Sequence, residues 1–305
     1  MFFYNCFKRY IYTKKIVNKV TKIPLFRLAP FTSLPTSFSH ISRRSLIQLS
    51  VLGLVLPAAH SANAEISLAT AINRCARFRA LSQRGAKAYA QLTLDVMPEA
   101  SFKTLTTVQR LFQQGFDDLA QSSFTPEITK QIAAVQTETT KLLTMITAKA
   151  KHDQLALVNT QADKVLALAH KATEMLTSAS KTANGKIIDM AGRQRMLSQR
   201  MAKNYYLTAA NVNLTAATQQ IAQDKAEFNT AMATLIKTPI STSAIREDLE
   251  LCSAQWFLFE GALDLPRNRA DAMKNVASTS ERLLELTNSL TDKYEKALKD
   301  VLGSV

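Results

Sequence analysis

The chain has 305 residues, with 38 Lys and Arg against 24 Asp and Glu, a net charge of +14, and 47% hydrophobic residues. This length permits one or two domains with a sizeable core, and the hydrophobic content excludes a wholly disordered chain. With only 7 Gly and 8 Pro, the composition argues against a β-sandwich or an α/β enzyme with glycine-rich loops and favours helices.

The positive charge is concentrated near the N-terminus. Residues 1–64 contain five Lys, four Arg and no acidic residue, which leaves +5 for residues 65–305. Because most of the excess lies in this leader, the basic composition does not support nucleic-acid binding. We leave the leader out of the fold prediction.

Residues 42–64 have the features of an export signal. Arg43-Arg44 precede an apolar stretch from Leu46 to Ala59, and the tripeptide Ala62-Asn63-Ala64 follows it. The stretch is short and interrupted for a membrane span of about 20 residues, and the paired arginines resemble a twin-arginine signal. We expect cleavage before Glu65 and a periplasmic protein. The alternative is an uncleaved signal that anchors the chain in the inner membrane.

Two segments of the remaining chain repeat one another. Residues 72–89 (INRCARFRALSQRGAKAY) and residues 188–205 (IDMAGRQRMLSQRMAKNY) are identical at ten of 18 positions, at a constant offset of 116. Later residues match at the same offset without a gap. The sequence therefore predicts a tandem duplication, with a first unit over 65–183 and a second over 184–305.

Each unit is predicted to contain four helices, because apolar residues recur at spacings of three and four and no useful length alternates like a strand. In the first unit we expect helices at about 66–96, 99–121, 127–147 and 150–181. The second unit repeats this pattern, with breaks at Thr238-Pro239 and at Gly261–Pro266. The predicted fold is all-α, as two tandem antiparallel four-helix bundles.

Asn184-Gly185 separates the two units and is typical of a helix stop. A hairpin there places the bundles side by side and brings their first helices together, whereas a continuous helix stacks them end to end. We favour the side-by-side arrangement.

The sharpest motif is the run AGRQRMLSQRMAK from Ala191 to Lys203, which has three Arg, one Lys and no acidic residue. Like charges on neighbouring turns repel, so the run indicates a negative partner, and the forked donors of guanidinium groups suit a small planar oxyanion. The candidate ligand-binding residues are Arg193, Arg195, Ser198, Gln199 and Arg200 in the second unit, and Arg77, Arg79 and Arg84 in the first.

Where the two matching helices meet, Arg84 and Arg200 are expected to hold one small anion, while the other arginines set the positive field. Two alternatives stay open: the arginines lie in water with their stems on apolar surface, or they pair with Glu281 and Glu285 of the last helix. The retention of three arginine pairs in both units, while most positions differ, is the argument for an anion.

The string AGRQRMLSQRMAK, with a Tyr after it, a downstream Phe and Trp256, resembles the N-terminal sensor domain of type IV pili methyl-accepting chemotaxis proteins (PilJ-type). That domain is similar to the periplasmic sensor of NarX-type nitrate/nitrite histidine kinases. The resemblance implies that an arginine of this helix from each of two subunits clasps nitrate at the dimer axis. It assigns this role to Arg200, with Arg84 as its counterpart, and places Arg195 and Arg79 at a second basic position.

The sequence departs from this family in three ways. Cys75-Ala76-Arg77-Phe78 replaces the Ala-Gly-Arg-Gln pattern in the first unit, and Gly85 stands opposite Met201. No membrane-spanning or signalling segment follows the second unit, so we expect transmission to need a partner.

Other candidate chemistry is weak. Cys75 and Cys252 are expected as small buried side chains, with a disulfide as the alternative, and His152 and His170 as exposed or capping residues. Trp256 is expected in the core. No spacing indicates a metal site, a cofactor or a catalytic group, so an enzyme is not expected.

The sequence therefore predicts a periplasmic, non-catalytic sensor module that binds a small oxyanion such as nitrate or nitrite and acts in chemosensory or type IV pilus signalling. The expected partners are this anion and a membrane-bound receptor or pilus protein, with no nucleic acid. The alternative is a structural or adaptor bundle that binds a pilus or chemoreceptor protein without a small ligand.

Overall fold

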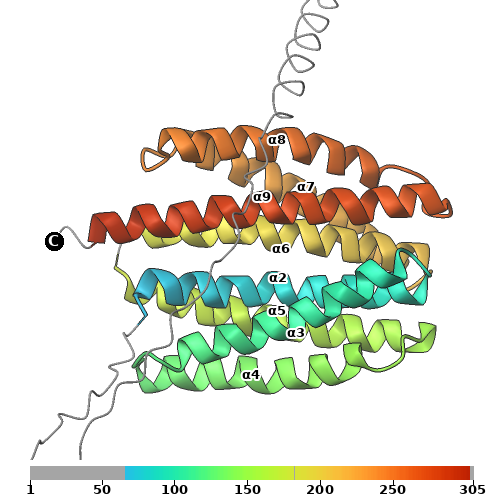
Figure 1. Ribbon diagram of the computed structural model, residues 1–305, viewed down its shortest axis with the longest axis horizontal. Coiled ribbons are helices and arrows are strands. Elements are labelled where there is room, and N and C mark those ends of the chain that lie inside the picture. The colour runs from blue at the N-terminus through green and yellow to red at the C-terminus, as the bar shows by residue number, and fades with distance from the viewer. Residues whose placement is uncertain (1–65, 182, 303–305) are drawn as a thin grey trace, which may run out of the picture. The chain divides into compact units, whose positions relative to one another are not determined.

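A computed structural model of the chain describes residues 66–181 and 183–302 (Figure 1). The predicted export signal and its cleavage before Glu65 lie outside the described residues. None of the described helices is both long and apolar enough to cross a membrane.

Two groups of four helices make up the described chain, in which no strand occurs. The first bundle contains α2 (Leu68–Thr93), α3 (Pro98–Leu119), α4 (Pro126–Thr147), a short 3-10 turn (His152–Gln154) and α5 (Leu155–Ala179). The second bundle contains α6 (Ala183–Ala209), α7 (Leu214–Lys237), α8 (Ser243–Leu263) and α9 (Ala270–Leu302). Within each bundle the first helix packs on the second and fourth, and the third packs on the fourth, which confirms the predicted all-α fold.

Side-chain caps start three of the described helices. The hydroxyl of Ser67 accepts a hydrogen bond from the backbone N–H of Thr70 at the start of α2. Thr125 caps α4 in the same way, with Pro126 at its first position, and Thr242 caps α8. Each cap satisfies a backbone donor that the helix itself leaves unpaired.

The bundles lie side by side, because α2 and α6 pack along each other at the centre of the described chain (Figure 1). The predicted helix stop at Asn184-Gly185 is wrong by a few residues. α5 ends at Ala179, Lys181 adopts a left-handed backbone with φ of 50°, and Asn184-Gly185 already belong to the first turn of α6.

The two bundles share one pattern of buried positions. The cores of α3 and α7 match at the offset of 116, for example Phe112 with Phe228. The loops before these helices also match, since Met97 and Asn213 both have left-handed backbones. The second helix of each bundle therefore has the same entry and the same buried face.

The offset then grows along the chain. Buried residues of α4 match those of α8 at an offset of 117, as Leu142 does Phe259, and those of α5 match α9 at 118, as Leu176 does Tyr294. The expectation of a gapless repeat is therefore wrong for the last two helices of the unit, because the second bundle gains one residue before α8 and another before α9.

The central helices α2 and α6 are surrounded by other helices, and their buried residues include many polar ones. The charged residues among them are Arg79, Lys87, Arg195 and Lys203, all at most 1% exposed. Buried charges are costly unless they find partners inside the protein. The contact between the bundles must therefore supply those partners.

The remaining notable side chains take the structural roles that the sequence predicts. Trp256 is buried and stacks on Phe228 with ring centroids 4.2 Å apart. Cys75 and Cys252 are buried, unpaired thiols, and burial raises the pKa of each to about 12.

The α2–α6 contact depends on Gly192. A methyl group on this residue would lie 3.1 Å from Cβ of Ala76, which belongs to the backbone-fixed part of α2. We predict that Gly192→Leu lowers the free energy of unfolding by about 1–3 kcal/mol, because it overpacks this contact.

The matched control is Gly261→Leu on α8, where an added Cβ meets nothing within 4 Å. There the leucine should stabilise the helix by up to about 1 kcal/mol. Urea unfolding of both variants checks the pair. Equal effects at the two glycines would contradict a close α2–α6 contact.

Candidate functional site

The two guanidinium groups that the structure brings together belong to Arg79 and Arg195. Both border Gly192: a methyl group built on this glycine would lie 3.0 Å from Nη2 of Arg195 and 3.7 Å from Nη2 of Arg79. Both arginines are fully buried, at 0% exposure. Two guanidiniums thus occupy the contact between α2 and α6.

Arg79 has a charged partner. Its Nη2 lies 2.6 Å from Oδ1 of Asp189 on α6, and its Nη1 lies 3.3 Å from Nδ1 of His170. Burial and the neighbouring Arg79 cation lower the pKa of His170, so this ring stays neutral near pH 7 and its nitrogen accepts from the arginine. The charge of Arg79 is therefore compensated across the bundle contact.

Arg195 has no such compensation. Its Nη2 donates to Oδ1 of Asn73 at 2.8 Å, and its Nη1 reaches Oδ1 of Asn288 at 3.5 Å. No carboxylate of residues 66–181 and 183–302 lies within ion-pair distance of this guanidinium. Burial lowers its pKa to about 9. The nearby cations Arg77 and Arg79 act in the same direction, and the carboxylates of Asp292 and Glu295 act in the opposite one.

The two environments differ at one position of the repeat. Asn73 of α2 and Asp189 of α6 correspond at the offset of 116, and each contacts the arginine of the other bundle. One arginine therefore faces a carboxylate, and its counterpart faces a neutral amide. Asn73 is itself held by α9, since its Nδ2 donates to Asp292 and Glu295. Arg195 therefore has no direct carboxylate partner, and Asn73 links it to the carboxylates of Asp292 and Glu295.

The structure does not place Arg84 and Arg200 around one anion. Arg84 forms a forked pair with Glu281 of α9, with Nε 3.2 Å from Oε1 and Nη2 2.5 Å from Oε2. Arg200 forms the equivalent pair with Asp224 of α7, at 2.9 and 2.6 Å. Each guanidinium uses its fork on a different helix, so the predicted clasp is not formed, whereas the alternative of pairing with Glu281 is confirmed for Arg84.

The other predicted residues serve the fold. Arg193 pairs with Glu227, and the half-buried Arg77 lies 3.5 Å from Asp292. Ser198 donates to the carbonyl of Arg195 in its own helix, and the Nε2 of Gln199 donates to the carbonyl of Ser280 in α9. These hydrogen bonds therefore direct neither the Ser198 nor the Gln199 side chain toward the Arg79–Arg195 guanidinium pair.

Two buried lysines that the sequence motif contains tie the bundles together. Lys87 of α2 lies 2.5 Å from Oε1 of Glu281 on α9, and Lys203 of α6 lies 2.7 Å from Oδ1 of Asp163 on α5. The lysines correspond at offset 116 and the acids at offset 118. Each first helix thus reaches the last helix of the other bundle. The lysine repeated at offset 116 is the sequence signal for these contacts. Its acidic partners correspond only at offset 118, so a comparison at constant offset does not find them.

Other chemistry is not assembled in the part of the chain that the structure describes. No three His, Cys, Asp or Glu side chains there gather as metal ligands. His152 is exposed, and its Nε2 lies 2.8 Å from the carbonyl oxygen of Ala210.

The architecture is that of a helical module with a buried arginine pair between two bundles. Residues 176–257 match the family described as type IV pili methyl-accepting chemotaxis transducer N-term, PilJ. The match runs from the end of α5 through α6 and α7 into α8, so it contains the arginine-bearing helix of the second bundle. It supports the PilJ-type resemblance and a role for this segment as a sensor module in signalling. No curated protein and no solved structure matches the chain.

The acid stability of the fold should depend on Glu281. Burial alone would raise the pKa of this carboxyl, but Lys87 and Arg84 hold it at about 2, below the ordinary value of 4.5. The stabilisation of the fold by ionised Glu281 is therefore complete above pH 4.5 and is lost as the pH falls toward 2. We predict that Glu281→Gln lowers the free energy of unfolding by about 3 kcal/mol at pH 7, because it leaves Lys87 buried and unpaired.

The difference between Glu281→Gln and wild type should shrink as the pH falls from 4.5 to 2, which chemical unfolding at several pH values measures. Glu285→Gln, on the exposed face of the same helix, is the control and should change little. A difference that stays constant with pH would show that the ion pair does not stabilise the fold.

Proposed function

We propose that the chain is a periplasmic, non-catalytic sensor module that binds a small oxyanion, with nitrate and nitrite as the first candidates, between Arg79 and Arg195. The observation that carries this proposal is the buried Arg195 guanidinium, which faces Asn73 where its counterpart Arg79 faces the carboxylate of Asp189. The PilJ match over α6 supports the sensor role.

The chemistry of the pair suits a planar monovalent anion. A guanidinium offers donors in a fixed fork, and charge-assisted hydrogen bonds to an oxyanion are roughly twice as strong as neutral ones. Low polarity around the buried groups strengthens the attraction further. In this proposal the anion supplies the negative charge that Asp189 supplies to Arg79, and Arg79 and Arg195 replace Arg84 and Arg200 as the contacts.

Binding at this place requires the bundles to move. Both guanidiniums are inaccessible in the described structure, and Gly192 leaves no spare room between α2 and α6. An anion therefore enters only when the two central helices shift relative to each other. A ligand that binds the shifted arrangement better populates it, which is how a binding event becomes a displacement that a membrane receptor can detect.

The shared pattern of buried positions and loops supports a tandem duplication as the origin of this arrangement. In the NarX-type kinases, the resemblance implies a site between two subunits. We propose that one chain provides both halves here, as an intrachain pseudo-dimer, and that divergence at Asn73 and Asp189 made the halves unequal.

Thermal melts of the purified protein with nitrate, nitrite, sulfate, chloride and small carboxylates test the proposal. A ligand that binds only the folded state adds about 2.7 kcal/mol of stability at a hundredfold excess over Kd. We expect a saturable increase of Tm with a planar oxyanion. Arg195→Gln should remove this response while leaving the unliganded protein at least as stable, because it removes a buried charge that lacks a carboxylate.

Two further variants sharpen the result. Asp189→Asn removes the internal carboxylate that competes for Arg79, so it should lower the Kd of the anion. Arg110→Gln removes an arginine from an exposed position and should leave the response unchanged. Anion responses that persist in Arg195→Gln, or no response to any of these anions at millimolar concentration, would refute the proposed site.

The adaptor alternative has an observation of its own. α8 exposes Leu251, Phe257 and Leu258, with Phe257 at 75% exposure, on the surface of the second bundle. Exposed apolar side chains on one helix are typical of protein contacts. If the module acts as an adaptor, Phe257→Asp should weaken its binding to a pilus or chemoreceptor protein, and Arg195→Gln should not. Surface plasmon resonance with the candidate receptor domain distinguishes the two roles.

A further inference from the structure

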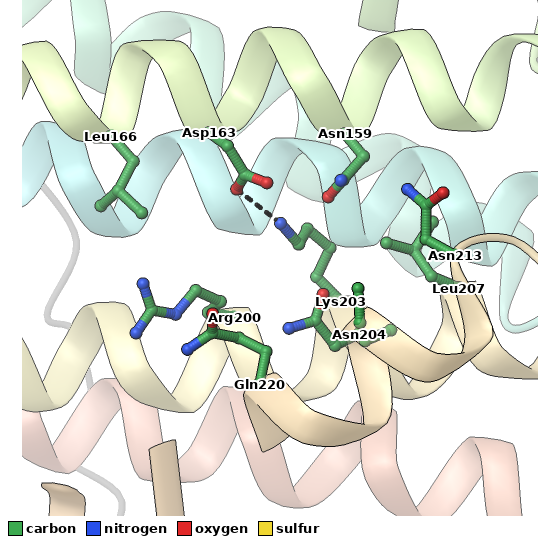
Figure 2. A pocket seen from close by; sticks show the side chains of 11 residues that line it. Asn159, Asp163, Leu166, Arg200, Lys203, Asn204, Leu207, Asn213 and Gln220 are labelled. Carbon is green, nitrogen blue, oxygen red and sulfur yellow. Dashed lines mark hydrogen bonds and ion pairs between the residues drawn. The ribbon is translucent and has the colours of Figure 1, made fainter. Parts of the chain in front are cut away.

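A polar cavity lies where α5 of the first bundle faces α6 and α7 of the second (Figure 2). Its volume is 310 Å³. At about 30 Å³ for each water molecule, this space suits a molecule of roughly ten or fewer non-hydrogen atoms. The cavity is separate from the Arg79–Arg195 pair, because neither of those arginines lines it.

One side of the cavity is positively charged. Lys203 is 1% exposed, and among the described residues its ammonium group has one acceptor, Asp163. An ammonium group has three protons to donate. Arg200 lines the same wall, and its bonds to Asp224 use Nε and Nη2 but not Nη1.

The first turn of α7 adds to this positive side. Asn213, Ala216 and Ala217 line the cavity, and the backbone of Asn213 is left-handed, so its side chain does not cap the helix. The start of a helix carries a partial positive charge and free N–H donors. A carboxylate is the group that fits this combination of lysine, arginine and helix start.

The opposite wall offers acceptors. The Oδ1 atom of Asn159 is buried and has no hydrogen-bond partner, and Figure 2 shows this side chain extending from α5 toward Lys203. Asp163, one turn further along α5, is 45% exposed and contacts Lys203 from the same side. A buried acceptor without a donor is costly, so this wall suits a group that donates a hydrogen bond.

The corresponding place in the other half of the repeat is built differently. There Glu281, the counterpart of Asp163, is one methylene longer and accepts from both Lys87 and Arg84. Beside the cavity, Arg200 instead donates to Asp224, and Asp163, which has the shorter side chain, accepts from Lys203.

The amides of the cavity also have no counterpart in the other half. At the repeat offsets, Asn159 and Asn204 correspond to Ala277 and Ala88. Both alanines are buried in the same fold. The polar lining is therefore not required by the architecture, which tolerates alanine at both equivalent positions.

We infer that this cavity binds a small carboxylic acid that carries an amino or hydroxyl group next to its carboxylate. The carboxylate lies against Lys203, Arg200 and the start of α7, and the neighbouring donor lies against Asn159 and Asp163. Because these groups come from α5 on one side and from α6 and α7 on the other, the ligand bridges the two bundles and stabilises their contact.

Isothermal titration calorimetry on the purified protein tests this inference with four kinds of probe. These are amino acids (L-alanine and L-serine), hydroxy acids (L-lactate and L-malate), acetate as a carboxylate alone, and ethanolamine as a donor alone. We expect saturable binding of amino acids or hydroxy acids, with a Kd at least about tenfold below those of acetate and ethanolamine. The preferred class identifies the neighbouring group.

Asn159→Ala and Asn204→Ala copy the residues of the other half, so both variants should fold, which circular dichroism and a thermal melt confirm. Each should raise the Kd of the preferred acid by about tenfold. Asp163→Asn should weaken amino acids more than hydroxy acids, because only an ammonium group gains from the carboxylate charge.

Arg195→Gln is the control that separates this cavity from the proposed oxyanion site, and it should leave acid binding unchanged. Binding that both alanine variants leave intact would place the acid elsewhere and overturn the inference. So would the absence of saturable heat with all of the acids at millimolar concentration, whatever the response to nitrate.

Discussion

The fold depends on the burial of basic side chains along its two central helices. α2 and α6 are covered on all sides, yet they carry Arg79, Lys87, Arg195 and Lys203 at most 1% exposed. Among the described residues the ion pairs of Lys87 and Lys203 are each formed with the last helix of the other bundle. Compensated charge therefore joins the bundles in addition to apolar packing. Separating them would break both ion pairs, Lys87–Glu281 and Lys203–Asp163.

The two bundles share one pattern of buried positions, so a difference between corresponding positions shows which interactions the fold does not require. Arg79 is compensated by Asp189, while Arg195 faces the neutral amide of Asn73. Glu281 satisfies two cations, while Asp163 satisfies one and leaves a cavity beside it. The two proposed ligand sites both lie in the half with fewer direct ion pairs.

Three- and four-residue spacing and the breaks in each unit predict the fold. The predicted helix bounds of the first unit lie within two or three residues of the observed ones, except that the last helix is predicted from 150 and begins at Leu155. The site was only partly predictable. The motif supplied the right helix and the right residue types, including Arg79 and Arg195, but not the face on which each arginine lies relative to a neighbouring bundle. The sequence predicts Arg84 and Arg200 as the anion contacts, yet in the structure their guanidinium groups pair with Glu281 and Asp224. Asp224 stands where the first unit has Val108, and Glu281 matches Asp163 only after a two-residue shift, so neither partner is visible in a gapless comparison.

The same buried charges determine how readily the α2–α6 contact can change when a ligand binds. A module in which every cation has an internal carboxylate has no reason to change when an anion arrives. Arg195 is different, because no carboxylate of the described residues lies within ion-pair distance of it. Burial lowers its pKa to about 9, and the carboxylates of Asp292 and Glu295 offset only part of that cost. In the proposed function an anion at Arg195 shifts α2 against α6. An added Cβ at Gly192 would lie 3.1 Å from Cβ of Ala76, so the packing between the bundles leaves little room to absorb such a shift locally.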